Sequence, residues 1–182
     1  MAQLMPSIFE TVRLLVRPWT LDDAEEAFAI YGDAEVSTFI SLTGPEASLE
    51  AQRESLARLI ARHEGWDPGY GFWAIVEKAS GRIVGSVMLK PLPGHAEIDV
   101  GWHLGRRAWG HGYATEAGRG AIQYGFDSLG LFRIVAVVNP LNTRSLAVCR
   151  RLGMKHEGRI EAYSLELELF SITPAQDGVG AE

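Results

Sequence analysis

The residues best suited to chemistry lie between Asp99 and Ala117, in the run DVGWHLGRRAWGHGYATEA. This run places a strand-like segment, a turn containing Gly110 and Gly112, and a helix-like segment in immediate succession. The first turn of a helix has free N–H groups and a partial positive charge, and glycines let an anion approach the backbone without a Cβ in the way. The pattern predicts a phosphate site at this turn, although two glycines at this spacing can also simply make a tight connection.

Two common phosphate motifs are missing from the sequence. No Gly-x-x-x-x-Gly-Lys-Ser/Thr run is present, and the dinucleotide fingerprint would need a glycine where Thr115 stands. That fingerprint also expects an acidic residue at the end of the next strand, which here ends in Val138, Asn139 and Pro140. A redox protein of the Rossmann type is therefore the least favoured interpretation of the turn.

The glycine turn resembles the cofactor-binding segment of the GNAT acetyltransferase superfamily, and is closest to its RimJ/RimL-like branch. Three blocks carry the resemblance, in the family's order and over nearly the whole chain: Trp109-Gly-His-Gly-Tyr-Ala-Thr-Glu-Ala117, Asn139-Pro-Leu-Asn-Thr-Arg-Ser145 with Val148-Cys-Arg-Arg-Leu-Gly-Met154, and Thr11-Val-Arg-Leu-Leu-Val-Arg-Pro18 with Leu21-Asp-Asp-Ala24.

The resemblance implies an α/β (α+β) fold with a mixed, mostly antiparallel sheet flanked by helices. The sheet is splayed between two central strands, and acyl-CoA, most simply acetyl-CoA as a cosubstrate, lies in the cleft. By similarity, the pantetheine arm pairs with the backbone of Trp102, His103 and Leu104 and is held by Asn142. The diphosphate is held by the amides of Trp109, Gly110, His111, Gly112, Tyr113, Ala114 and Thr115. A second register that starts the glycine motif at Arg107 also fits the superfamily pattern, but would shorten the preceding loop.

Acyl transfer to an amine requires a neutral amine, a polarised thioester carbonyl and a thiolate that can leave. Asp99 and Glu97 are two residues apart on one expected strand, so both point to the same face, and either could accept the amine's proton. Asp99 aligns better with an acidic residue common in this branch. Ser145 would reach the cofactor sulfur by the same resemblance, while Asn142 and Ser145 can also be no more than a helix cap. Tyr163 could act as a general acid, as C-terminal tyrosines do in parts of the superfamily, but its simpler role is packing.

Cysteine and metal chemistry are not expected. Cys149 shares a helix face with Leu146 and Leu152, which predicts a buried, unreactive thiol. The five histidines have no metal-ligand spacing, so we expect no metal.

The elements that must position these residues follow from hydrophobic periodicity and from cap and turn residues. We expect strands at 13–19, 72–76, 83–89, 96–104, 132–138 and 165–172, and helices at 21–31, 47–61, 112–130 and 142–152.

Length and composition fit one globular domain over residues 1–182, with a core at 10–173 and a loose tail at 174–182. The resemblance implies that this is an N-acetyltransferase domain. The net charge of −6 argues against nucleic-acid binding, and no apolar run is long enough to span a membrane. A single cysteine excludes an internal disulfide, and the N-terminus lacks a signal-peptide pattern, so we expect a cytoplasmic protein, either a monomer or a homodimer.

Two functions from different classes remain open on these residues. The first is an N-acyltransferase with a small-molecule or peptide amine as acceptor. A protein N-terminus is the analogy from the branch, and an amino acid, a polyamine or an antibiotic amine is equally allowed. The second is a non-catalytic module of the same fold that binds acyl-CoA or a partner, since fold does not fix function.

Overall fold

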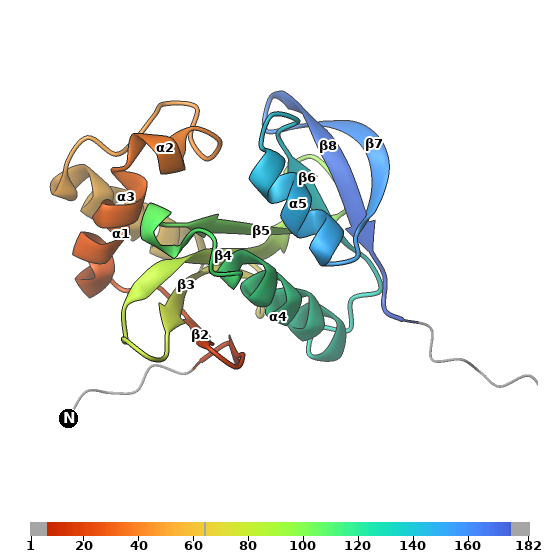
Figure 1. Ribbon diagram of the computed structural model, residues 1–182, viewed down its shortest axis with the longest axis horizontal. Helices are drawn as coiled ribbons and strands as arrows, with labels where there is room; N and C mark the ends of the chain where they lie inside the picture. Colours follow the sequence, from red (N-terminus) through yellow and green to blue (C-terminus); the bar gives the residue numbers. More distant parts are fainter. Residues whose placement is uncertain (1–6, 64, 176–182) are drawn as a thin grey trace, which may run out of the picture.

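The computed structural model describes residues 7–63 and 65–175. Its centre is an eight-stranded sheet in the order β1-β2-β3-β4-β5-β6-β8-β7 (Figure 1). The strands are β1 (Phe9–Glu10), β2 (Leu14–Arg17), β3 (Gly71–Glu77), β4 (Ile83–Pro91), β5 (Ile98–Leu104), β6 (Ile134–Val138), β7 (Lys155–Ala162) and β8 (Leu165–Ile172). The helices are α1 (Ala24–Tyr31), α2 (Ala34–Ser37), α3 (Leu49–His63), α4 (Tyr113–Asp127) and α5 (Thr143–Arg151), with short 3₁₀ turns at Leu21–Asp23 and Arg106–Ala108.

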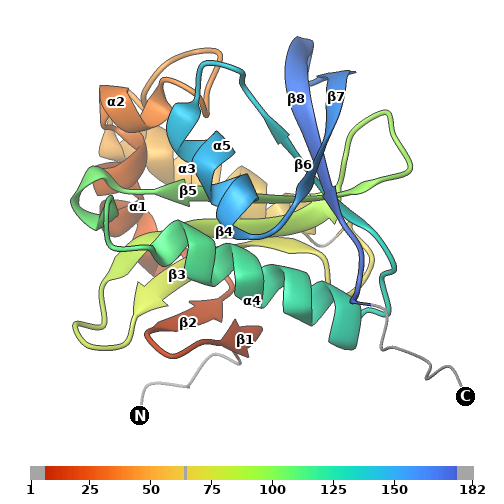
Figure 2. The same cartoon turned by 45° about the vertical axis from the view of Figure 1, so that its right-hand side comes forward.

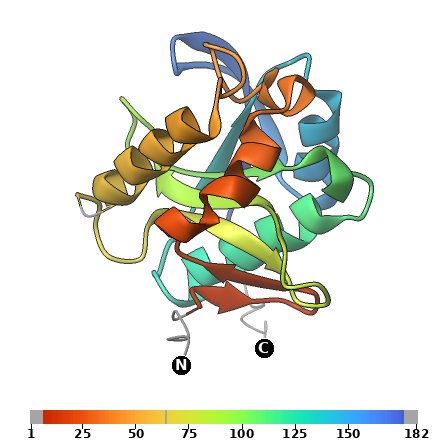
Figure 3. The ribbon, with the colours of Figure 1, turned by 90° about the vertical axis from the view of Figure 1, so that its left-hand side faces the viewer.

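The helices cover both faces of the sheet. α4 runs along one face, with α5 beside it (Figure 2), and buries the side chains of Val87, Leu89 and Val100 against Ala117 and Ala121. α1 and α3 lie over the opposite face (Figure 3), in a second core that includes Trp19, Leu56 and Ala74. Because side chains alternate across a strand, β4 and β5 present one set of residues to α4 and the other set to α1 and α3.

The sheet is splayed at its centre. β5 pairs with β4 along its whole length, from Ile98 to Leu104, but it pairs with β6 only where Asp99 lies opposite Val135. This is the one parallel pairing among the strands of the described residues, and the other neighbours are antiparallel. β5 and β6 therefore part after Asp99, which confirms the predicted α/β fold with a splayed, mostly antiparallel sheet.

Several elements differ from the predicted ones. β7 was not predicted, because its sequence KHEGRIEA lacks apolar alternation and most of its side chains are exposed at a sheet edge. The predicted strand at 132–138 begins only at Ile134, since Phe132 is 81% exposed. The strand expected at 96–104 begins at Ile98, so Glu97 lies just before it. β1 and α2 are too short to leave a periodic signal. Of the predicted tail at 174–182, residues 176–182 lie outside the described residues.

Candidate active site

The predicted anion site has the backbone geometry that it requires. Gly110 and Gly112 have φ values of 80° and 79°, in the left-handed region that glycine adopts without strain. Gly112 is the N-cap of α4, and no side chain caps the helix there. The N–H groups of the first turn, from Tyr113 to Thr115, are therefore left without a capping side chain. Uncapped amides and the positive end of a helix dipole suit a negatively charged ligand.

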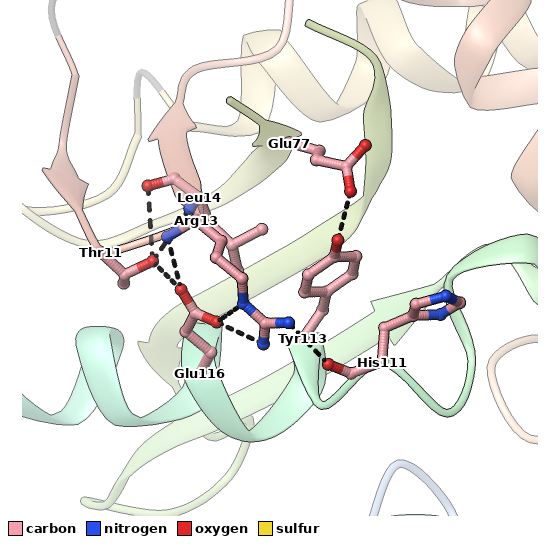
Figure 4. A network of polar contacts seen from close by, with 7 residues as sticks. All are labelled: Thr11, Arg13, Leu14, Glu77, His111, Tyr113 and Glu116. Carbon is pink, nitrogen blue, oxygen red and sulfur yellow. Dashed lines mark hydrogen bonds and ion pairs between the residues drawn. The ribbon is translucent and has the colours of Figure 1, made fainter. Parts of the chain in front are cut away.

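A network of polar contacts ties this helix end to the first strands (Figure 4). The Glu116 carboxylate accepts hydrogen bonds from the Thr11 hydroxyl at 2.6 Å and the Arg13 amide at 2.9 Å, and it pairs with the Arg13 guanidinium at 2.6 Å. Burial alone would raise the pKa of Glu116, but the hydrogen bonds from Thr11 and Arg13 outweigh it and lower that pKa. Arg13 also donates to the His111 carbonyl at 3.0 Å. The negative charge of Glu116 is thus compensated by the positive charge of Arg13, which also holds the glycine turn through the His111 carbonyl.

Asp99 lies at the point where β5 and β6 part. Its residue is only 4% exposed, and its carboxylate lies 3.8 Å from the Lys90 ammonium of β4. The Tyr163 hydroxyl donates to the same carboxylate at 3.1 Å and accepts a hydrogen bond from Lys90. Burial raises the pKa of Asp99 to about 6, although Lys90, Tyr163 and the Val137 amide favour the ionised form. A carboxylate of this kind is mostly ionised at neutral pH and is a stronger base than a solvated one.

Tyr163 reaches Asp99 from the turn between β7 and β8. Tyr163 and Ser164 have φ values of 53° and 61°, which is uncommon for residues other than glycine. Conformations of this kind persist where the surrounding contacts hold them. The turn therefore aims the tyrosine hydroxyl at Asp99 and Lys90.

Glu97 is placed differently from Asp99. It precedes the first residue of β5, and its carboxylate lies 3.3 Å from the guanidinium of Arg133, which also pairs with Glu157 at 2.6 Å. Glu97 thus lies just outside β5 and pairs with Arg133, whereas Asp99 contacts Lys90 and Tyr163. Of the two carboxylates, Asp99 is the one that lies where β5 and β6 part.

Asn142 and Ser145 form the predicted cap of the last helix. The Asn142 side-chain oxygen accepts a hydrogen bond from the Ser145 backbone N–H at 3.1 Å, which leaves the Ser145 hydroxyl outside the cap. The Arg144 guanidinium stacks over the Trp109 ring, 4.0 Å from its centroid. The first turn of α5 and the glycine turn therefore lie next to each other, at the end of the sheet where β5 and β6 have separated.

The strand residues predicted to bind pantetheine, Trp102 to Leu104, lie on β5 beyond its last pairing with β6. Trp102 packs against α4 near Gly118, whereas the His103 ring lies on the opposite face, 3.3 Å from the Tyr31 hydroxyl. Burial, followed by the charge of Lys90, lowers the pKa of His103 to about 4. The Leu104 carbonyl is already engaged, because it accepts a hydrogen bond from the Trp109 indole at 2.9 Å.

The remaining expectations concern cysteine and metal chemistry. Cys149 is fully buried, as predicted, and burial raises the pKa of its thiol to about 12, so a thiolate does not form at neutral pH. In the part of the chain that the structure describes, no three His, Cys, Asp or Glu side chains gather as a metal site would require. In the same part, no helix has the length and apolar composition needed to cross a membrane.

Lys90 is the main site residue that the sequence did not reveal. It stands at the end of an apolar strand run, a position where lysines are usually solvated. Only the β4–β5 register, which sets Lys90 opposite Asp99, shows its role. The sequence offers Tyr163 as a possible general acid, but it does not show the contact with Asp99, because Tyr163 lies in a turn 64 residues further along the chain.

Comparisons with known proteins show the family to which the chain belongs. A family model described as an acetyltransferase (GNAT) domain matches residues 13–155. The chain is 32% identical over 156 residues to the uncharacterised N-acetyltransferase p20 of Bacillus licheniformis, covering 84% of this chain and 85% of the relative. It is 30% identical over 159 residues to the uncharacterised N-acetyltransferase YoaA of Bacillus subtilis, covering 86% of this chain and 87% of the relative.

Solved structures share the fold. A GNAT-family acetyltransferase from Bacillus anthracis superposes with a TM-score of 0.75 at 24% identity, covering 90% of this chain and 96% of the other. Mycobacterium smegmatis RimJ in complex with CoA-disulfide superposes with a TM-score of 0.73 at 23% identity, covering 88% and 82%. The match of the family model to most of the chain, together with the named relatives, confirms the resemblance found in the sequence. The chain belongs to the GNAT acetyltransferase family and is an N-acetyltransferase.

Proposed function

We propose that this protein moves the acetyl group of acetyl-CoA directly to a primary amine while both substrates are bound. The observation that carries the proposal is the position of Asp99, a buried carboxylate with a pKa of about 6 at the parting of β5 and β6. The thioester of acetyl-CoA supplies an activated acyl group, and the protein's residues bind, orient and exchange protons with the reactants.

The backbone around the parting fits this cosubstrate. The uncapped amides of α4 and the left-handed glycine turn support binding of the diphosphate by Trp109 to Thr115. The edge of β5 that leaves β6 offers unpaired backbone groups to the amides of the pantetheine arm at Trp102, since the carbonyl of Leu104 is engaged. The backbone groups of His103 point to the other edge, towards Ser86 of β4, because successive residues of a strand alternate in direction. Asn142, whose oxygen caps α5, keeps its NH₂ group available for the same arm.

Asp99 performs the proton transfer in this proposal. An alkyl ammonium has a pKa of about 10, so little of the amine is nucleophilic at neutral pH. Asp99 accepts the amine's proton, directly or through a water molecule, while Lys90 and Tyr163 fix the orientation of its carboxylate. The nitrogen then forms a bond to the acyl carbon, the carbon–sulfur bond breaks, and the sulfur leaves as a thiolate that takes up a proton.

The direct test is release of thiol from acetyl-CoA in the presence of a panel of primary amines. The proposal requires release that depends on both the enzyme and an amine, with an acetylated amine as the second product. Tight binding of acetyl-CoA with no thiol release for any amine would instead indicate a non-catalytic acyl-CoA-binding protein.

Replacing Ser145 with alanine should lower kcat about tenfold and change the affinity for CoA by less than twofold. The helix cap survives this change, because Asn142 binds the backbone N–H of residue 145 and not its hydroxyl. Only a contact of the hydroxyl with the departing sulfur is lost. Thr143→Ala, in the same exposed turn, is the matched control. Equal turnover of the Ser145 variant and the parent protein would leave residue 145 without a chemical role.

Replacing Arg13 with glutamine should weaken CoA binding about fivefold, because Glu116 would then present an uncompensated negative charge beside the diphosphate amides. Adding Glu116→Gln should restore most of the affinity, which separates electrostatics from loss of packing. Calorimetric titration with CoA measures both effects. Lys78→Gln removes a cation from a neighbouring strand end without touching Glu116, and should leave affinity within about twofold. A double variant no better than Arg13→Gln would contradict this account.

A further inference from the structure

Lys90 and Asp99 stand opposite each other on paired strands but do not form a direct hydrogen bond. The register of β4 and β5 sets the two residues against each other, at a position where Cβ atoms lie about 5 Å apart and a lysine can reach the carboxylate. The ammonium nitrogen nevertheless lies 3.8 Å from the carboxylate oxygen, whereas a charge-assisted N–H···O bond is about 2.7–2.9 Å long. The two opposite charges are therefore held apart although they are within reach.

The Tyr163 hydroxyl bridges these two charges. It accepts a hydrogen bond from the Lys90 ammonium and donates one to the Asp99 carboxylate at 3.1 Å. The ammonium also lies 4.8 Å from the centroid of the Tyr163 ring, which is a cation–π distance. The lysine thus bonds to the tyrosine, and the carboxylate oxygen receives a neutral donor in place of a charged one.

The turn that carries Tyr163 fixes the hydroxyl in this place. Ala162 pairs with Leu165 at the ends of β7 and β8, so the turn between these strands consists of Tyr163 and Ser164. Both residues have a left-handed φ, at which turns of this kind favour asparagine and glycine. Ala162 is buried against β6 and β8, which anchors the turn. A tyrosine therefore stands where the turn alone favours a smaller residue, and this points to a use for its side chain.

Other titratable groups face this pair from the surrounding elements. Burial lowers the pKa of Lys90, the charge of Asp99 opposes this effect, and the charge of Arg62 on α3 adds to it. On β5, burial lowers the pKa of His103 to about 4, and on α5 it raises the pKa of the Cys149 thiol to about 12. Two groups that precede β5 are engaged elsewhere, namely Glu97 with Arg133 and His95 with the carbonyl of Glu161. Near pH 6, therefore, neither His103 nor Cys149 changes its charge, whereas Asp99 does.

A direct ion pair with Lys90 would make Asp99 a weaker base. A cation in contact with a carboxylate lowers its pKa by about 1 to 3 and occupies the oxygen that would receive a proton. A hydrogen bond from a neutral hydroxyl stabilises the carboxylate less than one from an ammonium. With the ammonium held by the tyrosine, burial keeps the pKa of Asp99 raised to about 6, close to the pH at which a base must work.

We propose that the Tyr163 hydroxyl is a spacer, which takes the hydrogen bond of the Lys90 ammonium and so leaves the Asp99 carboxylate free to accept the proton of the acceptor amine. Tyr163 acts through Asp99 and is therefore a positioning residue, not a general acid. Lys90 favours the ionised form of Asp99 through its charge, without donating a hydrogen bond to it. The inference rests on the acetyl transfer proposed above, in which Asp99 is the base.

The test removes the hydroxyl and follows the titration of Asp99 by carbon NMR of the labelled carboxyl groups, with Asp99→Asn to assign the signal. In Tyr163→Phe the ammonium can close on the carboxylate, so the titration midpoint should fall by about one pH unit. The acid limb of kcat/KM should move down with it, and kcat/KM at neutral pH should fall about threefold or more, because the base is weaker. A tyrosine that only donated a hydrogen bond would have the opposite sign, since loss of a donor raises the pKa of a carboxyl group.

A second variant shows whether the effect depends on the lysine. Lys90→Met should raise the midpoint by about one pH unit or more, because a buried carboxyl group loses its cation. In the double variant, Tyr163→Phe should no longer lower the midpoint, since no ammonium is left to approach Asp99. Ser164→Gly is the matched control in the same turn: glycine adopts a left-handed φ without strain, and the midpoint should not change.

The outcomes separate the spacer from the acetyl transfer. A midpoint that rises or stays the same in Tyr163→Phe, or that falls equally with and without Lys90, would overturn the spacer and leave the transferase intact. If no amine released thiol, the acetyl transfer would fail, but the NMR titration needs no turnover. In that case, a fall that requires Lys90 would still support the spacing of the two charges by Tyr163, and a rise would refute it.

Discussion

Asp99→Asn should reduce kcat/KM for the acceptor amine about 100-fold or more at neutral pH. Asparagine keeps the shape of the side chain but cannot accept the amine's proton. The loss should shrink as the pH rises towards the pKa of the amine, because an increasing share of the amine is then already neutral. Pseudo-first-order rates of thiol release, measured from pH 5 to 10, give this profile for both proteins.

The pH profile of the parent protein gives a second test of Asp99. Asp99 works in its ionised form, and burial raises its pKa to about 6, so activity should fall as the pH drops through about 6. The asparagine variant should lack this fall. Tyr163, whose pKa burial raises, keeps its proton throughout this range. Glu97→Gln distinguishes the two carboxylates: if it abolishes activity while Asp99→Asn does not, the base is Glu97. If neither change matters, solvent removes the proton.

Gly112→Val should weaken CoA binding at least tenfold, or about 1.4 kcal/mol. The φ of Gly112 is 79°, and an added Cβ would enter open space whose nearest neighbour is the Arg13 guanidinium at 3.6 Å. The side chain would therefore stand where we expect the diphosphate, and a β-branched residue would also strain this left-handed position. Calorimetric titration with CoA measures the affinity directly.

Gly130→Val is the matched control for this strain. Gly130 follows the other end of α4, has a φ of 67°, and an added Cβ there would also meet nothing within 4 Å. Both variants should lose similar thermal stability, but only Gly112→Val should lose affinity for CoA. If the two variants bind CoA equally well, the glycine turn has no part in the site.

The parts of the site with local signals could be predicted from the sequence. Gly110 and Gly112 predict a left-handed turn, and Asn142 predicts the start of a helix. Both predictions succeed because the conformation depends on residues within a few positions along the chain. The family resemblance then supplied the splayed sheet. No local signal sets Lys90 opposite Asp99 or brings Tyr163 to the same carboxylate, since both depend on strand pairing across the chain.

The missed elements have a similar explanation. β7 lies at the edge of the sheet and turns mostly polar side chains to solvent, so it has no hydrophobic period to detect. Sequence periodicity reports which face of an element is apolar, but not which polar residues converge from different elements.

The parting of β5 from β6 also bears on how the protein tolerates mutation. A strand edge recognises its ligand through backbone N–H and C=O groups, which are nearly the same for every residue type. Side chains at Trp102 and His103 are therefore constrained by what they pack against, α4 on one face and Tyr31 on the other, and not by the cosubstrate. Substitutions that preserve this packing are compatible with recognition of the pantetheine arm. Along this edge, the cosubstrate adds no constraint on the side chains beyond this packing, so side chains elsewhere in the protein can change to suit a new acceptor without altering the way the protein holds CoA.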